Sequence, residues 1–362
     1  MTIIIVAESM RTGDAVGNTV MQEYFALKKY GHEILLYSGN ADNDFTAYLI
    51  DRTRLLKEIK KQDAVLLYHH SIYWEDGGYI LREAQARVVL RYHNVTPEHF
   101  FARYSPLFQN LAKQGRQQTK EFIDSGRIAH YVADSAYNAS ELVECHAPPE
   151  RISIVAPFHK VGDFERTHLN LDLLESLLDG RINVLSVGRI VPNKGLHHAM
   201  KVIDRYLDYY GNNIRFNIVG GSDPHFQRYQ EELEALVSRY GMGGHVAFHG
   251  KVSFPDLHTY YAASHVLLLL SEHEGFCLPI LEAQYHKLPV IALDRGAVKD
   301  TLGVEQLSFQ DIDADVFASA IHVVARNNDM RNYLAEQGFR NHQRYHPDIL
   351  ARQLTGIMHA AR

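Results

Sequence analysis

The feature that most constrains the fold is an alternation, begun twice along the chain, of short apolar runs and helix-length amphipathic stretches. This alternation is typical of strands joined by crossover helices in parallel sheets. In the first half, we expect strands at residues 2–7, 32–38, 63–68, 86–92, 129–134 and 152–156. In the second half, we expect them at 182–187, 215–220, 245–249, 265–270 and 289–293. The sequence therefore predicts an α/β protein with two doubly wound parallel sheets.

The length also favours two domains. The chain has 362 residues, and single hydrophobic cores usually stop growing at about 250–300 residues. Residues 156–164 combine Pro157, Gly162 and charged side chains without periodicity, as in a linker. We expect an N-terminal domain over residues 1–160 and a C-terminal domain over residues 161–346. A last helix over residues 347–362 packs back on the first domain or stays with the second.

Composition and charge exclude several classes of protein. Apolar residues make up 46% and charged residues 22% of the chain, close to the averages for globular proteins. With a net charge of -6, the chain lacks the positive electrostatic field that is typical of nucleic-acid-binding proteins. The two cysteines, Cys145 and Cys277, lie far apart and outside zinc-site spacing, which favours a reducing compartment. No nucleic-acid partner is expected.

The first apolar run, residues 1–7, is interpreted as a buried strand. It has no basic flank and is followed at once by Glu8, Arg11 and Asp14, so it is not typical of a signal peptide. No apolar stretch reaches the roughly 20 residues that cross a bilayer. We expect a cytoplasmic protein whose membrane contact, where it exists, is peripheral at the inner membrane.

The most informative segment is SEHEGFCLPILEA, residues 271–283, which follows an apolar strand and enters a helix. We expect Gly275 and the backbone N–H groups of Phe276, Cys277 and Leu278 to face a ligand at the positive end of the helix dipole. Two carboxylates, Glu274 and Glu282, flank this point. The other interpretation is a solvated capping Glu followed by an ordinary helix Glu.

A second segment, VGRIVPNKG at residues 187–195, places two cations at another junction of strand and helix. Gly188 and Arg189 follow the strand, and Lys194 precedes the next helix. Fixed cations at a helix N-terminus suit a diphosphate and the negative charge that develops on it as it leaves. Alternatively, both are surface charges on a loop.

The first half carries weaker signals. The loop ESMRTGDAVGN, residues 8–18, follows the first strand and offers Gly13 for a close backbone approach to a ligand. His93 stands at the carboxyl end of the strand at 86–92, where ligands of such sheets bind. Ordinary structural roles compete with both interpretations. For His69 and His70, after another strand, the structural role is favoured, and Ser135 is a candidate by position only.

Together these segments resemble glycosyltransferase family 4 over nearly the whole chain. The resemblance implies a GT-B fold, in which two Rossmann-like domains face each other across a cleft. It implies that Glu274 lies near the donor sugar, and that Glu282 binds the ribose of the nucleotide. It also implies that Arg189 and Lys194 bind the donor phosphates. His93 resembles the family's active-site His, whereas the loop at Gly13 departs from the commoner Gly-Gly form.

The resemblance implies a retaining transferase that moves a hexose of mannose or glucose type from a GDP- or UDP-sugar to a carbohydrate or lipid-linked acceptor. The expected setting is bacterial polysaccharide or lipopolysaccharide biosynthesis. A nucleotide-sugar epimerase or a phosphorylase on the same fold, and a non-catalytic binding protein, are the alternatives. An epimerase would consume donor without acceptor, a phosphorylase would need phosphate, and a binding protein would leave the donor intact.

We expect neither a metal nor a cofactor. The acidic run at residues 311–315 (DIDAD) imitates a metal-binding pattern but is expected to start a helix. His197 and His198 have no acidic or Cys partner at metal-ligand spacing in the sequence. Aromatic residues in the loops at 71–79 and 96–104 could stack on sugars, line a lipid-proximal groove or pack in the core, and the sequence leaves these alternatives open.

Overall fold

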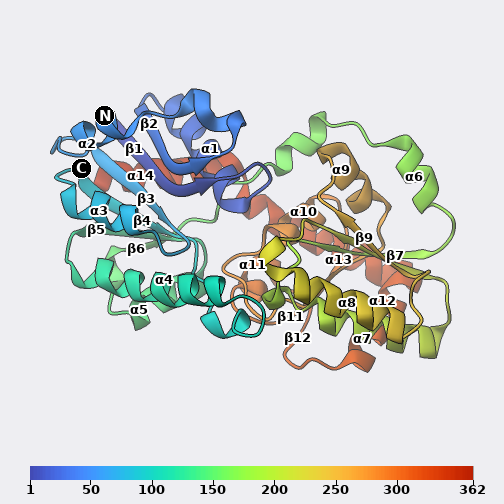
Figure 1. Ribbon diagram of the computed structural model, residues 1–362. Coiled ribbons are helices and arrows are strands. Elements are labelled where there is room, and N and C mark those ends of the chain that lie inside the picture. The colour runs from blue at the N-terminus through green and yellow to red at the C-terminus, as the bar shows by residue number, and fades with distance from the viewer. Residues whose placement is uncertain (362) are drawn as a thin grey trace. The chain divides into compact units, whose positions relative to one another are not determined.

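The computed structural model describes residues 1–361 and shows two compact units. Unit 1 contains Met1–His99, Leu107–Lys160 and the described residues 345–361, and unit 2 contains Phe100–Pro106 and Val161–Arg344. Each unit holds one six-stranded, all-parallel sheet with helices on both faces (Figure 1). The predicted pair of doubly wound parallel sheets is confirmed.

The sheet of unit 1 has the strand order β2-β1-β3-β4-β5-β6. Its strands are almost continuously apolar because helices cover both faces. Their bounds are β1 Thr2–Met10, β2 Glu33–Ala41, β3 Val65–His70, β4 Arg87–Tyr92, β5 Ile128–Ala133 and β6 Ile152–Ile154. The longer helices are α1 Ala15–Lys29, α2 Arg52–Glu58, α3 Glu75–Glu83, α4 Pro106–Asp124, α5 Ala136–Glu144 and α14 Pro347–Ala360. Short 3-10 turns are η1 Asn43–Tyr48, η2 Glu98–Phe100 and η3 Pro149–Arg151.

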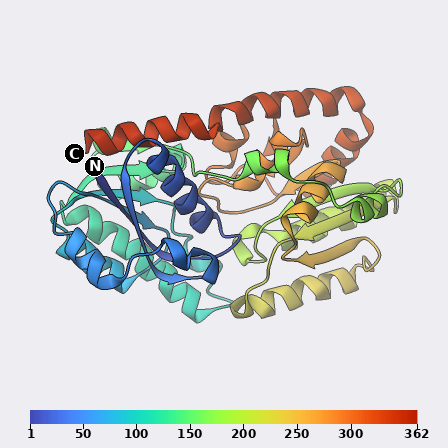
Figure 2. The ribbon, with the colours of Figure 1, turned by 90° about the horizontal axis from the view of Figure 1, so that it is seen from above.

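The last helix, α14, packs on α1 in unit 1. The rings of His32 and His359 meet edge to face, and Lys29 forms an exposed ion pair with Asp348. Figure 2 shows the two chain ends beside each other in this unit. This settles which unit holds the last helix.

The sheet of unit 2 has the order β12-β11-β10-β7-β8-β9. Its strands are β7 Ile182–Val187, β8 Ile214–Val219, β9 Val246–Gly250, β10 Val266–Leu269, β11 Val290–Leu293 and β12 Leu307–Phe309. Its helices are α6 Leu171–Leu177, α7 Leu196–Tyr210, α8 Gln227–Arg239, α9 Phe254–Ala263, α10 Leu278–Tyr285, α11 Val298–Leu302, α12 Ala314–Arg326 and α13 Asn328–His342. The 3-10 turns are η4 Val161–Arg166, η5 Pro192–Lys194, η6 Pro224–Phe226 and η7 Gln343–Tyr345, the last crossing into unit 1.

Three local features differ from or refine the sequence prediction. The edge strand β12 was not predicted, because its three half-buried residues carry no apolar run. Strand β1 continues to Met10, so Glu8 is in the strand and not in the loop, and Gly17 lies within helix α1. The acidic run at 311–315 starts helix α12, as predicted, since the Asp313 carboxylate accepts from the backbone N–H groups of Asp315 and Val316.

One aromatic side chain from each loop, Trp74 and Phe101, packs within its own unit, whereas Tyr79 of the first loop is 39% exposed. Trp74 stacks on Tyr37 and Tyr68 against the core of unit 1. In unit 2, Phe101 is buried against Phe226. These three contacts favour the core-packing alternative for Trp74 and Phe101.

Candidate active site

The second unit gathers its predicted site residues where β7 and β10 end. These strands are hydrogen-bonded neighbours, so the segments after them meet at the same edge of the sheet. The Lys194 ammonium lies 2.6 Å from Glu274 Oε1, joining the two segments that the sequence singled out. Glu274 is buried and the Lys194 side chain is 21% exposed. The pair therefore lies at the edge of the sheet with the Lys194 side chain partly exposed.

Lys194 stays charged in this setting. Burial works against its charge, but the Glu274 carboxylate outweighs it, and the pKa of Lys194 is raised. The side chain of Arg189 is exposed, and no ion pair involving it is present among residues 1–361. Gly188, Arg189, Lys194 and Ser271 line a small cavity of about 10 Å³. This edge thus offers two cations, one of them unpaired.

Ser271 is a site residue that the sequence reasoning missed. It is fully buried, and its hydroxyl has no hydrogen-bond partner among the described residues although it lines the cavity beside Lys194. A buried hydroxyl without a partner is costly unless a ligand or water completes it. Its place directly after the apolar β10 strand was the only signal in the sequence.

Two glycines let the backbone segments approach each other. Gly195, at φ +63°, begins helix α7, and a Cβ there would lie 1.9 Å from the Leu270 carbonyl oxygen. Gly296, at φ +60°, was not predicted as part of the site, and a Cβ there would lie 2.4 Å from the Glu274 carbonyl oxygen. Both positions require glycine because of conformation and of space.

Helix α10 begins where the motif predicted it. Pro279 has no N–H, and the Ile280 N–H donates to the Cys277 carbonyl at 3.2 Å. Of the first helical donors, the N–H groups of Cys277 and Leu278 therefore remain for a ligand. Cys277 adopts a left-handed conformation at φ 79°, which is uncommon outside glycine. Burial raises the pKa of its thiol well above the usual value.

The other residues of the motif separate into different roles. Gly275 and Phe276 lie on the turn before α10, and the Phe276 carbonyl accepts from the Thr301 hydroxyl at 2.6 Å. Glu282 is on the second turn of α10 and accepts from the Tyr261 hydroxyl at 2.6 Å. Burial nevertheless raises the pKa of Glu282. No contact joins Glu282 to Glu274 among the recorded interactions of the described residues.

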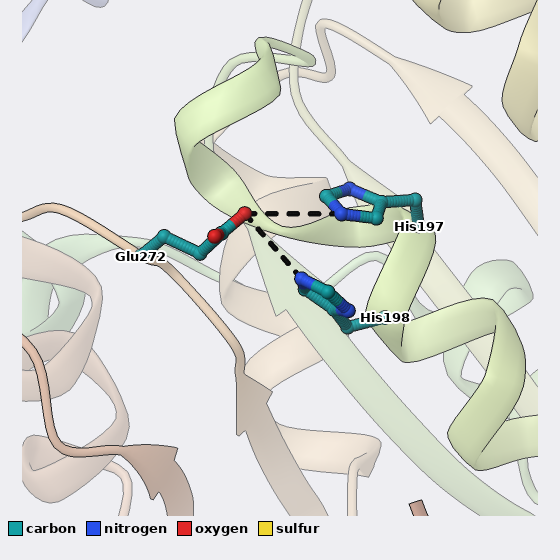
Figure 3. Close-up of side chains that lie close together, drawn as sticks. All are labelled: His197, His198 and Glu272. Atoms are coloured by element: carbon teal, nitrogen blue, oxygen red, sulfur yellow. Dashed lines mark ion pairs between the residues drawn. The ribbon is translucent and has the colours of Figure 1, made fainter. Parts of the chain in front are cut away.

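His197, His198 and Glu272 form a cluster that the sequence did not predict (Figure 3). Glu272 Oε1 lies 3.8 Å from His197 Nε2 and 3.4 Å from His198 Nε2. The expectation that these histidines lack an acidic partner is corrected, because the partner comes from the segment after β10. Figure 3 shows both rings turned toward the carboxylate. Two imidazoles and a carboxylate are ligand types that a divalent transition metal accepts.

The first unit brings His93 to the ends of β4 and β5. His93 Nδ1 lies 2.7 Å from Asp134 Oδ2, and its Nε2 lies 2.8 Å from His69 Nδ1. The next residue, Asn94, is left-handed at φ 75° and donates to Asn138, which stabilises this turn. The sequence favoured an ordinary structural role for His69, and its contact with His93 was missed.

The remaining candidates of the first unit lie apart from this contact. Gly13 is on the turn between β1 and α1, at φ +83°. His70 is buried and bonds Thr119 at 2.8 Å, as expected of a structural histidine. Ser135 caps helix α5 by accepting from the Asn138 N–H.

Comparison with known proteins relates this geometry to a family of enzymes. Residues 175–341 match the family model described as "Glycosyl transferases group 1". This part of the chain is similar to group 1 glycosyltransferases. All the predicted site residues of the second unit, from Gly188 to Glu282, lie within this match.

Individual relatives agree with this similarity. The chain is 29% identical over 326 residues to the D-inositol 3-phosphate glycosyltransferase of Acidothermus cellulolyticus, covering 86% of this chain and 70% of the relative. It is 29% identical over 161 residues to the O-antigen chain mannosyltransferase RfbU of Salmonella typhimurium, covering 43% of each. The fold is similar to that of Anabaena HepE, solved with UDP and glucose, with a TM-score of 0.79, 14% identity and coverage of 99% and 100%. The predicted GT-B class is confirmed.

No helix among residues 1–361 of the chain is both long enough and apolar enough to span a bilayer.

Proposed function

We propose that this chain is a retaining group 1 glycosyltransferase that transfers a hexose, of mannose or glucose type, from a UDP- or GDP-sugar to a carbohydrate or lipid-linked oligosaccharide. The observation that carries the proposal is the Lys194–Glu274 pair beside the exposed Arg189 at the edge of the second sheet. Two cations suit the two phosphates of such a donor, and a buried carboxylate suits the sugar hydroxyls.

The named relatives support parts of this proposal. HepE was solved with UDP and glucose, and RfbU is named a mannosyltransferase of the O-antigen chain. These names favour a nucleotide-sugar donor and an acceptor in bacterial surface polysaccharide. We therefore place the reaction in the cytoplasm, with peripheral contact at the inner membrane where the acceptor is lipid-linked.

The proposed mechanism follows from the charges at this edge. As the bond between the anomeric carbon and the diphosphate oxygen breaks, negative charge builds on the diphosphate. Arg189, Lys194 and the N–H groups of Cys277 and Leu278 stabilise that charge. The acceptor oxygen bonds to the anomeric carbon on the same face, and its proton passes to the departing diphosphate oxygen. The configuration of the sugar is thereby retained.

We propose that the reaction needs no metal, because two side-chain cations supply the charge that a divalent ion would otherwise supply. The cluster of His197, His198 and Glu272 gives this proposal a sharp test. Transfer should be unchanged by a strong chelator and by His198→Asn. Loss of transfer in the chelator, restored by one divalent metal in the wild type but not in His198→Asn, would contradict metal independence.

The donor and the reaction are tested by one screen of the purified chain without metal. Thermal shifts and product formation are measured with UDP-, GDP-, ADP- and dTDP-sugars, each with and without a saccharide acceptor and with and without phosphate. Stabilisation by UDP- or GDP-sugars, weakened in Glu282→Ala, together with acceptor-dependent release of nucleotide, supports the proposal. Donor conversion without acceptor, turnover only with phosphate, or binding without turnover under every condition would instead indicate an epimerase, a phosphorylase or a binding protein.

A further inference from the structure

Two histidines and a glutamate of unit 2 turn their side chains toward one point beside the candidate active site. His197 and His198 are in the first turn of α7, and Glu272 lies in the segment after β10. Figure 3 shows both imidazoles directed at the carboxylate. With one ligand atom taken from each residue, no two of the three atoms are more than 4.8 Å apart. The two segments that carry them therefore bring three ligand atoms together.

The distances in this cluster are longer than those of hydrogen bonds and suit a shared ion. His198 Nε2 lies 3.4 Å from Glu272 Oε1, and His197 Nε2 lies 3.8 Å from the same oxygen. A charged N–H···O bond to a carboxylate is about 2.7–2.9 Å long. Bonds from Zn²⁺ to imidazole nitrogen and carboxylate oxygen are about 2.0–2.2 Å, so the ligand atoms of a tetrahedral site are about 3.3–3.6 Å apart. The observed spacing is closer to that of ligands around one cation.

His198 gives a second, independent observation. Its Nε2 is buried and has no hydrogen-bond partner among the described residues. A buried polar atom without a partner is costly unless a bound group completes it. A metal ion between the three side chains would complete this nitrogen together with the other two ligand atoms.

His197 has the kind of neighbour that orients a metal-binding imidazole. Its Nδ1 lies 3.1 Å from the hydroxyl oxygen of Tyr229, on α8, while its Nε2 faces Glu272. When a metal occupies Nε2, the ring proton is on Nδ1 and can bond this oxygen, as is usual for metal-bound histidines. Burial, with His198 beside it, lowers the pKa of His197 to about 4. The ring is therefore neutral, as a metal ligand must be.

We propose that His197, His198 and Glu272 bind one transition-metal ion, with Zn²⁺ as the expected ion, and that this ion cross-links the start of α7 to the segment after β10. Two imidazole nitrogens and one carboxylate suit Zn²⁺, whereas Mg²⁺ and Ca²⁺ prefer ligand sets made of oxygen. The side chains of His197 and Glu272 are 34% and 31% exposed, so a water molecule can supply the fourth ligand.

The ion has a structural role and takes no part in the proposed transfer reaction. The two segments that it joins also carry Lys194 and Glu274. A cross-link at Glu272 would hold these segments together when no donor is bound. Because the ion binds the folded chain and not the unfolded one, we expect it to raise the thermal stability of unit 2.

The test is metal binding to the full chain, purified without a histidine tag, stripped of metal with a chelator and studied without donor. Zn²⁺ is titrated by calorimetry, and Co²⁺ is titrated by visible absorption, which reports the coordination geometry. We expect saturable binding of one ion per chain, a tetrahedral cobalt spectrum and a higher thermal midpoint with Zn²⁺. Absence of saturable Zn²⁺ binding, or binding of Mg²⁺ with equal affinity, would overturn the proposal.

Variants show whether both segments hold the ion. His198→Asn and Glu272→Gln each remove one ligand, so each should weaken Zn²⁺ binding by at least about 100-fold and abolish the thermal shift. The matched control is His168→Asn, which removes an exposed histidine of unit 2 outside the cluster and should bind Zn²⁺ as the wild type does. Thermal midpoints in chelator establish that the variants are folded.

Wild-type affinity for Zn²⁺ in either folded cluster variant would overturn the proposal. Retained affinity in Glu272→Gln alone would mean that the ion is held by α7 without a cross-link. Because no donor is present, these results are independent of whether transfer is detected.

Discussion

The two sheets differ in whether the charged side chains at their carboxyl edges are buried and paired or left exposed. In unit 1, the side chain of Arg91 is buried and is paired with the buried carboxylates of Glu23, on α1, and Asp134, after β5. In unit 2, Arg189 is exposed, and Lys194 has one carboxylate partner and a partly exposed side chain. The charges at the first edge are therefore compensated by the protein itself, whereas we propose that those at the second edge are compensated by a ligand.

Because of this difference, we expect substitutions at the two edges to change different properties, stability at the first edge and substrate binding at the second. Removing one member of a buried ion network leaves a charge without compensation and costs about 3–5 kcal/mol. Replacing an exposed, unpaired cation changes stability by roughly 0.5 kcal/mol or less. Substitutions at the first edge should thus mainly lower the free energy of unfolding. Substitutions at the second edge should mainly weaken substrate binding and transfer.

The largest effect is expected for Arg91→Met, which leaves Glu23 and Asp134 buried without their cation. We expect unit 1 to lose about 3–5 kcal/mol of unfolding free energy. Trp74 is the only tryptophan and packs in the core of unit 1, so its fluorescence in urea reports on this unit. In the control Lys60→Met, which breaks an exposed ion pair with Glu83, the loss should be at most about 1 kcal/mol. Equal losses in both variants would contradict the comparison.

Lys194→Met should reduce the rate of transfer by about 10²–10³-fold, because it removes a cation from the departing diphosphate. Arg189→Met should weaken donor binding and transfer while leaving the thermal midpoint nearly unchanged. The rate constants are measured at saturating acceptor. Lys201→Met, an exposed lysine on the same helix α7, should behave as wild type. Wild-type rates in both site variants would refute the role of the cations.

Gly195→Ala tests whether the loop before α7 needs its close approach to Leu270. Strain and the clash at 1.9 Å should cost about 2–4 kcal/mol. The matched control is Gly241→Ala, after α8 in the same unit, which has φ +66° but nothing within 4 Å of the added Cβ. That change should cost only about 1–2 kcal/mol. Calorimetry of the unfolding transition of unit 2 measures the loss of stability in both variants. Equal losses would show that the clash of the added Cβ with Leu270 does not contribute.

The smallest effect concerns Glu282 and pH. Because burial raises the pKa of Glu282, the native state binds more protons than the unfolded chain just above the usual pKa of a glutamate. Stability therefore falls as pH rises through that interval. Nucleotide affinity should instead increase over the same interval, because only the carboxylate accepts from both ribose hydroxyls.

The check is calorimetric titration of the nucleotide between pH 5 and 8 in wild type and in Glu282→Gln. The variant should lose about 5–30-fold in affinity at the upper pH, equivalent to about 1–2 kcal/mol. It should also lose the pH dependence. If the pH dependence of nucleotide affinity persists unchanged in Glu282→Gln, it arises from a group other than Glu282.

Much of the fold could be predicted because each strand is a short apolar run covered on both faces. Strand β7 was predicted over its observed residues, 182–187, whereas β12 lies at the sheet edge without such a run. The motif at 271–283 predicted the start of α10 for a local reason, the placement of Pro279 in the first turn.

The contacts that could not be predicted depend on strand order. His69 meets His93 because β3 pairs with β4, and His93 meets Asp134 because β4 pairs with β5. Glu272 reaches His198 because β10 lies beside β7. Sequence periodicity gives the ends of strands, but it does not say which ends are neighbours.

The central claim, that the edge of the second sheet is completed by a nucleotide diphosphate, is tested most directly by hydrogen exchange with mass spectrometry. The whole chain is compared with and without the diphosphate of its preferred donor, in the presence of a chelator. We expect slower exchange in residues 187–198 and 271–285, and no such protection in Lys194→Met. Unchanged exchange in both segments at saturating nucleotide, or protection confined to unit 1, would contradict the claim.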